Sequence, residues 1–439
     1  MLFCPAIRGA PRTARTPGHG MIEAQKGTRD ILPDEIGRWQ LVEERARATF
    51  ESYGFREIRT PIFESTELFA RTIGVATDIV AKEMYTFLDR KGRSLTLRPE
   101  NTAPVARALI EHQMHRGGGL QRLYYIGPMF RYERPQKGRA RQFHQIGVEV
   151  FGSEHPAVDA ETLDMLMAFL ENLGIAGAEL AVNSVGCPVC RPAYREALLA
   201  YLRPRQDTMC QDCMRRITQN PLRCFDCKVP ADRETMASAP PITDSLCSEC
   251  RVHFARVVAL LQSFGIAHRI EPRLVRGLDY YRRTSFEVTV PGLGAQNALL
   301  GGGRYDGLTR DLGGPDVPGF GFAVGEERLV LSLPASMLRS EGGPLLSIVA
   351  LGEAGADQAL RVGRSLRRSG RRVVFEPQPD RSLKAQMRRA NDLGAAFVLM
   401  IGESEIAEES VTVRRMADGT QERLAEGRVP ERLRELAGA

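Results

Sequence analysis

The sequence predicts an α+β protein in which helices flank an antiparallel sheet, with a cysteine-rich insertion and a separate C-terminal α/β domain. Apolar and polar residues alternate around Gly and Pro over 124–151 and 269–290, as they do in antiparallel strands. Residues 184–266 hold eight of the nine cysteines. With 439 residues, the chain exceeds the roughly 250–300 that one hydrophobic core usually serves, so several domains are expected.

The chain opens on a segment without a structural pattern. Residues 1–20 contain Arg8, Arg12 and Arg15, no acidic residue and no apolar period. This composition is compatible with a targeting segment. The patterned part begins only at Met21, so we predict a disordered extension or a misassigned start over the first twenty residues.

The first predicted element is an amphipathic helix after Pro33. Apolar residues recur at spacings of three and four from Trp39 to Tyr53, and the pattern stops at Gly54. The strands of the antiparallel sheet follow. Residues 21–335 are therefore predicted to form the main domain.

An inserted module is expected at residues 184–266, where cysteines and arginines cluster around helices predicted at Ala193–Leu202 and His253–Ser263. Another change of pattern follows Gly343. The expected strands are Leu346–Leu351, Arg372–Phe375 and Ala396–Ile401, and the expected helices are Ala356–Ser369 and Leu383–Leu393. This alternation predicts a small α/β domain over 345–439.

Composition and charge narrow the class of protein. Hydrophobic residues make up 43% and charged residues 26% of the chain. No apolar run approaches the ~18 residues of a membrane span, so we expect no membrane association and a cytoplasmic location. The net charge of +6 suits a polyanionic partner, but many proteins this basic bind no nucleic acid.

The densest chemical pattern is the stretch 130–143, in which two strand-like runs flank a basic loop with Pro and Gly. An arginine fork binds phosphate oxygens bidentately and stays charged at any working pH, so Arg131 is a candidate polyphosphate ligand. Taken alone, the stretch is equally typical of a solvated, charged hairpin.

In its order of motifs the chain resembles the class II aminoacyl-tRNA synthetases, in the form found in the histidyl-tRNA synthetase family. The stretch 130–143 resembles motif 2, 59–64 resembles the dimer-forming motif 1, and 319–328 resembles motif 3. The matching stretches are residues 26–30 (KGTRD), 59–64 (RTPIFE), 130–143 (FRYERPQKGRARQF), 276–281 (RGLDYY), 300–306 (LGGGRYD) and 319–328 (GFGFAVGEER). Two of them, 276–281 and 300–306, resemble the histidine-specific motifs.

The resemblance implies activation of L-histidine with ATP and Mg²⁺ to histidyl-adenylate, followed by transfer to the 3′-end of tRNA(His). It also implies a homodimer, a class II catalytic domain and a C-terminal anticodon-binding domain. Phosphoryl transfer needs charge stabilisation and alignment more than acid–base groups, which fits arginines as the catalytic residues.

The resemblance also assigns individual residues. The expected catalytic residues are Arg276 and Arg131. The expected ATP ligands are Arg131, Glu133, Arg139, Phe143 and Arg328. The expected histidine ligands are Glu100, Asn101, Thr102, Arg131, Gln145, Glu149, Arg276, Tyr280 and Tyr281, of which Glu149 and Tyr281 contact the imidazole. Asn101 stands where the family often has Gly, which leaves its part open. The expected tRNA contacts are Arg134 and Gln136 on the motif 2 loop, and Lys384 and Arg388, with Arg389 beside them, on a terminal helix.

Eight cysteines in the insertion form four C-x-x-C pairs, a pattern typical of structural zinc. They are Cys187/Cys190, Cys210/Cys213, Cys224/Cys227 and Cys247/Cys250. Nineteen residues separate the first pair from the second and the third from the fourth, which favours consecutive pairing. Nested pairing, a single metal, disulfides and free thiols remain alternatives.

Two other functions fit parts of this pattern. A catalytically inactive synthetase-like paralogue would bind histidine as a regulatory subunit, but it would tend to lose the ATP arginines and the C-terminal domain. A class II synthetase for proline or threonine would share motifs 2 and 3 but lack the 276–281 motif.

Overall fold

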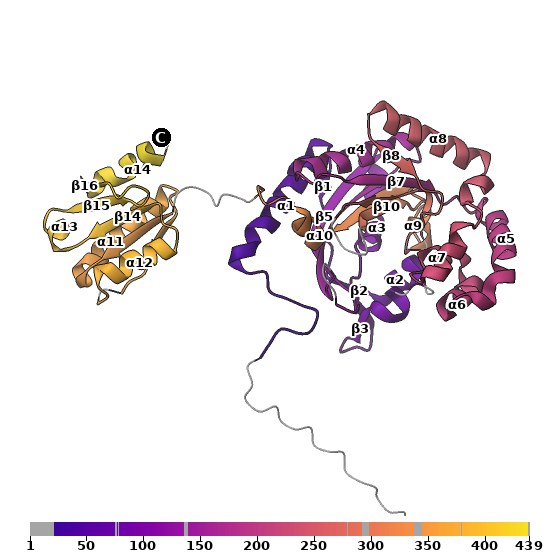
Figure 1. Ribbon diagram of the computed structural model, residues 1–439, viewed down its shortest axis with the longest axis horizontal. Coiled ribbons are helices and arrows are strands. Elements are labelled where there is room, and N and C mark those ends of the chain that lie inside the picture. Colours follow the sequence, from indigo (N-terminus) through magenta and orange to yellow (C-terminus); the bar gives the residue numbers. More distant parts are fainter. Residues whose placement is uncertain are drawn as a thin grey trace, which may run out of the picture. The chain divides into compact units, whose positions relative to one another are not determined.

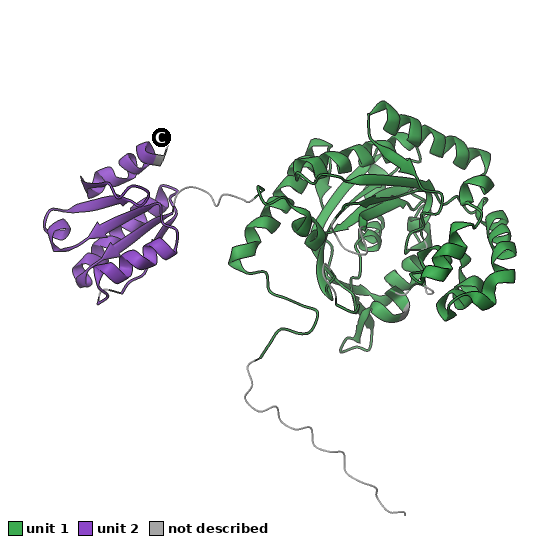
Figure 2. Cartoon of the chain, viewed as in Figure 1, with its two compact units in different colours: residues 1–338 green, residues 339–439 purple. Residues whose placement is uncertain are grey.

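The computed structural model describes residues 22–74, 77, 79–135, 139–278, 280–291, 298–337, 345–378 and 380–437. The chain divides into two compact units, Met1–Leu338 and Arg339–Ala439 (Figure 2). The first twenty residues, predicted as a disordered extension, lie outside the described residues. None of the helices in the described part of the chain has the length and apolar composition that crossing a bilayer requires.

An eight-stranded sheet forms the centre of unit 1 (Figure 1). Its strands, in spatial order, are β1 (Arg56–Glu57), β5 (Gln121–Phe130), β6 (Gln142–Phe151), β11 (Gly319–Gly325), β10 (Ala298–Arg304), β9 (Arg282–Thr289), β7 (Glu179–Ser184) and β8 (His268–Ile270). Only the edge pairs β1/β5 and β7/β8 are parallel, so the predicted antiparallel core is confirmed.

One face of this sheet carries the main hydrophobic core, because alternate residues of each strand point to the same side. Val148 and Val150 of β6 and Phe320 and Phe322 of β11 are buried in it. The helices that cover this face are α1 (Pro33–Ser52), α4 (Pro156–Asn172), α8 (Ser248–Ser263) and α10 (Glu326–Ser332). The odd-numbered residues of β6 therefore face the opposite side, where the functional side chains gather.

Smaller elements border that second face. A three-stranded sheet has the order β2 (Phe63–Ser65), β4 (Ser94–Leu97), β3 (Tyr85–Leu88). The accompanying helical segments are α2 (Thr66–Ile73), η1 (Ile79–Glu83), α3 (Thr102–Glu111), η2 (Met114–Gly117) and α9 (Leu308–Asp311). Helix α3 packs through Val105 and Leu109 against the same cluster as Tyr125 of β5, which fixes its N-terminus beside the sheet.

The cysteine-rich insertion is mostly helical, as predicted (Figure 1). Between β7 and α8 it contains α5 (Arg191–Leu202), η3 (Arg203–Thr208), α6 (Gln211–Gln219), η4 (Pro221–Asp226), α7 (Pro230–Ala237) and η5 (Ile242–Ser245). Helix α8 begins five residues before the predicted His253 and packs against α4 with Phe254, Val257 and Leu261. The insertion thus ends on the core of the unit.

Unit 2 is a five-stranded sheet with helices. Its order is β13 (Val373–Phe375), β12 (Leu346–Ala350), β14 (Phe397–Ile401), β15 (Ser410–Arg415), β16 (Gln421–Ala425), and its helical segments are α11 (Gly352–Arg368), α12 (Leu383–Asp392), α13 (Glu403–Ala407), η6 (Glu426–Arg428) and α14 (Val429–Ala437). The three predicted strands are parallel. Two further strands, β15 and β16, add an antiparallel hairpin that the sequence pattern did not predict.

Candidate active site

Glu149 lies at the centre of the second face of the sheet. It is on β6 and is fully buried, and burial raises its pKa to about 8 although hydrogen bonds from Tyr305 and Thr102 oppose that shift. The Thr102 hydroxyl donates to Oε1 at 2.7 Å, and the Tyr305 hydroxyl donates to Oε2. Gly321 of the neighbouring strand makes room for this carboxyl, since a Cβ there would lie 2.3 Å from Oε2.

Glu100 and its two successors lie at the start of α3. Both Glu100 oxygens accept backbone hydrogen bonds, from Thr102 N at 2.8 Å and Ala103 N at 3.0 Å, yet burial still raises the pKa of this carboxyl. Asn101 is turned to a different task. Its Oδ1 accepts from the Thr60 hydroxyl at 2.6 Å, while its buried Nδ2 has no hydrogen-bond partner among the described residues.

Aromatic rings form one wall of the site. Tyr280 and Tyr281 are both buried, with ring centroids 4.7 Å apart, and Tyr305 meets Tyr280 edge-on at 5.8 Å. Gly319 permits this packing, because a Cβ there would approach the Tyr305 ring to 2.2 Å. Gln145 lies on the same side of β6 as Glu149, and its buried Oε1 has no partner among the described residues.

Arg276 is held beside the glycine-rich strand β10. Its Nη1 donates to Glu287 Oε2 at 2.7 Å, whereas its buried Nε has no partner among the described residues. Gly301 is essential to this placement, because a Cβ at that position would lie 2.3 Å from Cζ of Arg276. Glu287 and Gly301 are themselves paired across β9 and β10, so the sheet register brings the arginine, its partner and the gap together.

Arg131 follows directly after β5. Its Nε donates to the carbonyl of Pro99 at 2.8 Å, and its guanidinium lies 5.2 Å from the centroid of the Phe143 ring. Arg139 pairs with Glu133 at 3.1 Å, and Glu133 also lies 3.9 Å from Arg131. These four residues of the motif 2 stretch therefore form one cluster, which a solvated hairpin would not require.

Arg328, at the start of α10, approaches the same cluster. Its Nη1 donates to the carbonyl of Ala298. Burial and the nearby positive charge of Arg139 lower the pKa of Arg328. Repulsion between two arginines is unfavourable unless an anion binds between them, so this end of the cluster suits phosphate oxygens.

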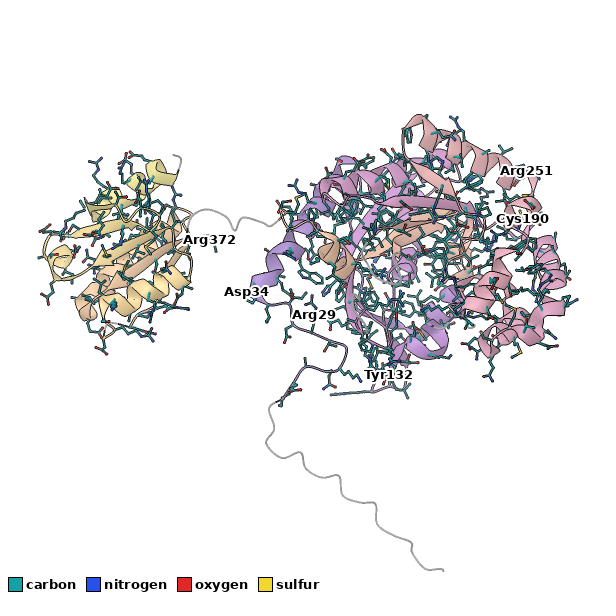
Figure 3. All side chains as sticks on the ribbon, in the orientation of Figure 1. Arg29, Asp34, Tyr132, Cys190, Arg251 and Arg372 are labelled. Atoms are coloured by element: carbon teal, nitrogen blue, oxygen red, sulfur yellow. The ribbon has the colours of Figure 1, made fainter. Side chains whose placement is uncertain are left out.

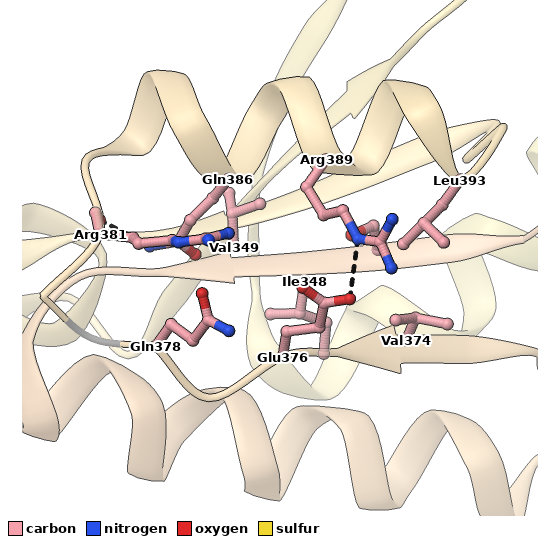
Figure 4. Close-up of a pocket in the computed structure, with 10 residues that line it drawn as sticks. Ile348, Val349, Val374, Glu376, Gln378, Arg381, Gln386, Arg389 and Leu393 are labelled. Atoms are coloured by element: carbon pink, nitrogen blue, oxygen red, sulfur yellow. Dashed lines mark hydrogen bonds and ion pairs between the residues drawn. The ribbon is translucent and has the colours of Figure 1, made fainter. Parts of the chain in front are cut away.

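The residues predicted to bind tRNA are distributed over both units. Arg134 is exposed after β5, and Gln136 lies outside the described residues. Lys384 and Arg388 are exposed on one side of α12. Arg389, expected beside them, instead pairs with Glu376 at 2.9 Å, so its charge is already compensated (Figure 4).

The eight cysteines of the insertion are reduced and form two groups. The base group is Cys187, Cys190, Cys247 and Cys250, and the distal group is Cys210, Cys213, Cys227 and Asp232. Cys190 lies within the insertion (Figure 3). This arrangement is nested, so the consecutive pairing favoured by the nineteen-residue spacing is wrong. Both spacings are equal in sequence, and the fold decides between them by bringing the start of α5 to the start of α8.

Several residues of the site were not singled out from the sequence. Tyr305 belongs to the 300–306 motif but was given no role, although it donates to Glu149. Glu287 and Asp232 lie outside every motif, and their roles follow only from strand register and from the folding of the insertion. Cys224, by contrast, was predicted as a metal ligand but lies outside the distal group.

Comparison with known proteins identifies this site. A family model described as histidyl-tRNA synthetase matches residues 27–329, and one described as an anticodon binding domain matches 346–436. The chain belongs to the histidyl-tRNA synthetase family. The histidine–tRNA ligase of Moorella thermoacetica is 51% identical over 94% of this chain and 97% of its own length. That of Syntrophotalea carbinolica is 52% identical over 92% and 96%.

The solved structures agree with this membership. Apo histidyl-tRNA synthetase of S. aureus superposes with a TM-score of 0.79 at 39% identity, over 94% of this chain and all of that chain. A protein of Bacillus halodurans, described as an ATP phosphoribosyltransferase regulatory subunit/histidyl-tRNA synthetase, matches at 22% identity and a TM-score of 0.62, which shows the shared fold alone. The chain is thus a histidine–tRNA ligase that uses ATP, with histidine and tRNA as substrates.

Proposed function

We propose that histidine is bound between Glu149, Tyr281 and the start of α3, and that the unpaired polar atoms of this pocket are its ligands. Buried polar groups are almost always hydrogen-bonded, so each exception needs an explanation. In this pocket Gln145 Oε1, Asn101 Nδ2 and Arg276 Nε are buried without a partner among the described residues. A zwitterionic amino acid offers both donors and acceptors to such atoms, and this single observation carries the proposal.

Within that pocket the imidazole is assigned to Glu149 and Tyr281. Glu149 is held by Thr102 and Tyr305 on both oxygens, so it presents a carboxyl of fixed orientation. A site that hydrogen-bonds a polar substrate group can reject an isostere by about 10⁴-fold without editing. The α-amino group is assigned to Glu100, Thr102 and Gln145, with the Tyr280 ring lining the pocket.

For catalysis we infer that Arg131 and Arg276 hold the two anions that must react. The histidine carboxylate attacks the α-phosphorus of ATP, its oxygen forms the new bond, and pyrophosphate leaves with the electrons of the broken bond. Neither step needs a proton from the protein. The arginines offset the negative charge on both groups and align them, which is the main requirement of such a reaction.

The rest of ATP is assigned to the motif 2 cluster and α10. Glu133 and Phe143 are placed at the adenine, and Arg139 and Arg328 at the outer phosphates. The mutual repulsion of these two arginines supports an anion between them. Mg²⁺ would enter with the triphosphate, bound chiefly by phosphate oxygens, and would neutralise charge on the leaving group.

For tRNA we propose two contact regions. Arg134 and Gln136 on the motif 2 loop are assigned to the acceptor end, where Arg and Gln suit base edges. Lys384 and Arg388 on α12 are assigned to backbone phosphates of the anticodon stem, because they are exposed and no ion pair within the described residues compensates them. The functional domains are proposed to extend over 21–335, with the insertion at 184–266, and over 345–439.

We also propose a homodimer formed through the 59–64 motif. Ile62 and Phe63 of this motif are about half exposed, and large apolar side chains grouped at a surface typically mark a protein interface. The insertion is proposed to contain structural zinc, since two groups of sulfur ligands converge there. A cytoplasmic location is proposed because charged tRNA is consumed by translation.

The alternative of an inactive regulatory paralogue is disfavoured by the ATP cluster. Arg131, Arg139, Arg276 and Arg328 are all present, and unit 2 matches an anticodon binding domain. Amino-acid-dependent pyrophosphate exchange tests the choice directly. We expect exchange with histidine but not with proline or threonine, and binding of histidine without any exchange would contradict the proposal.

A further inference from the structure

The sulfur positions in the insertion have the spacing of tetrahedral zinc sites. With Zn–S bonds of about 2.3 Å, two sulfurs of one tetrahedron lie about 3.8 Å apart. The observed separations are 3.7 Å for Cys187/Cys190 and 3.9 Å for Cys187/Cys247 in the base group, and 3.7 Å for Cys210/Cys227 in the distal group. A disulfide would bring two sulfurs to about 2.05 Å, so these cysteines are arranged around a centre and not bonded in pairs.

The two groups differ in their fourth ligand. Asp232 of the distal group is buried, and its Oδ2 lies 3.2 Å from Cys227 Sγ. The backbone N–H of Cys210 donates to both carboxylate oxygens at 3.2 Å, which orients the group as outer hydrogen bonds orient metal ligands. The distal ligand set is therefore three thiolates and one carboxylate.

A short segment connects the distal group to the active site. Cys213 and Cys227 flank η4 (Pro221–Asp226), and Arg223 of η4 donates from Nη1 to the backbone carbonyl of Arg276 at 3.1 Å. Asp226 of the same segment pairs with Arg223 at 3.0 Å and so holds the arginine in that direction. Arg223, Arg276 and Tyr281 together line a cavity of about 480 Å³ between the insertion and the histidine loop.

We propose that the distal group binds a Zn²⁺ ion through Cys210, Cys213, Cys227 and Asp232, separate from an ion in the base group, and that this ion makes η4 a positioning element for Arg276. The three thiols release their protons when the metal binds. The fixed segment then lets Arg223 hold the backbone of Arg276. The positioning half of the inference rests on the catalytic role proposed for Arg276, whereas the metal half is independent of it.

Metal analysis of the full-length protein, purified without added zinc, tests the first half. We expect two zinc ions per chain, one per chain in Asp232→Ala, and two again in Asp232→Cys. Cobalt substitution of the unaltered protein distinguishes the ligand sets without a variant, because a four-thiolate and a three-thiolate, one-oxygen site differ in their d–d bands. One ion or none, iron in place of zinc, an unchanged metal content in Asp232→Ala, or two four-thiolate spectra would each overturn the distal assignment.

Pyrophosphate exchange tests the second half. Arg223→Ala should keep both ions and lower kcat by about tenfold, with little change in the histidine KM, since a displacement of about 1 Å can cost up to about 10²-fold. Arg223→Lys should recover part of the rate, and the exposed Arg215→Ala on α6 is the matched control. A normal kcat in Arg223→Ala would refute the positioning role. If Arg276→Ala is also normal, the proposed function itself fails, so the two failures are distinguishable.

Discussion

Glu149 in unit 1 and Lys384 in unit 2 represent two ways of placing charge for a substrate. Glu149 is fully buried, both of its oxygens accept hydrogen bonds, and its pKa is raised to about 8. Lys384 and Arg388 are exposed on α12 without a compensating ion pair among the described residues. The first arrangement suits one small ligand with fixed geometry, whereas the second suits a polyanion whose backbone can shift along the surface. Mutations should therefore have large, specific effects in unit 1 and small, salt-dependent effects on α12.

The largest effect is expected at Arg276. Replacing it by Ala or His should lower histidine-dependent pyrophosphate exchange by roughly 10²-fold or more, the scale for loss of an oxyanion donor. Histidine binding should change less. The control is Arg269→Ala, which removes an exposed arginine paired with Glu271. Near-normal exchange in a folded Arg276→Ala enzyme would remove the catalytic assignment.

Deletion of unit 2, Arg339–Ala439, should separate the two half-reactions. All proposed histidine and ATP ligands lie at or before Arg328, so exchange should persist. Aminoacylation at low tRNA concentration should fall by about 10²-fold, within the range that a second, linked binding site contributes. Both rates are to be measured on a truncation with normal circular dichroism, and an equal loss of both would argue against a tRNA-binding role for unit 2.

Glu149→Gln should raise the histidine KM by about 10-fold to 10²-fold, because hydrogen bonds to charged groups contribute roughly 1.5–3 kcal/mol. The ATP KM should remain close to normal. Steady-state exchange kinetics with each substrate varied in turn give both values. A matched increase in both KM values would indicate general damage to the pocket in place of a histidine contact.

On α12, the double substitution Lys384→Ala/Arg388→Ala should weaken tRNA binding only several-fold. The slope of log K against log salt should decrease by about one for each phosphate that the protein no longer neutralises. Filter binding over a range of salt concentrations gives this slope. Arg432→Ala serves as the control, since Arg432 already pairs with Glu422 and Glu435. A salt slope equal to that of the control variant would reject α12 as a phosphate-binding surface.

The smallest effect concerns stability and pH. In the folded protein burial raises the pKa of Glu149 from its ordinary value of 4.5 to about 8, so over that interval the folded state binds more protons than the unfolded state. The contribution of Glu149 to stability is thus fully present below about pH 4.5 and declines as the pH rises towards 8. Relative to Glu149→Gln, the native protein should lose about 1–3 kcal/mol of unfolding free energy between pH 5.5 and 8. Urea titrations at several pH values measure this slope, and parallel curves for the two proteins would contradict it.

Much of the site could be predicted because it follows local sequence. The alternation along β6 places Gln145 and Glu149 on one side of the sheet, and the motif 2 arginines lie within a single hairpin. Glu287 could not be predicted as the partner of Arg276, because that contact depends on the pairing of Gly301 with Glu287 between two strands. Asp232 was missed for the same kind of reason, since equal cysteine spacings admit two pairings and only the three-dimensional path selects one.

The nested arrangement of the cysteines has a consequence for how this chain can change. Cys187 and Cys247 lie sixty positions apart, yet their sulfurs are 3.9 Å from each other, so the segment between them is a closed loop joined at its neck. The entropy of closing a loop grows only slowly with its length, by about 0.6 kcal/mol for each doubling. Residues could therefore be added or removed between Cys213 and Cys227, or after Asp232, at little cost to the underlying sheet. The neck would confine such variation to the module, and its length could diverge while the strands that carry Glu149 and Arg276 keep their register.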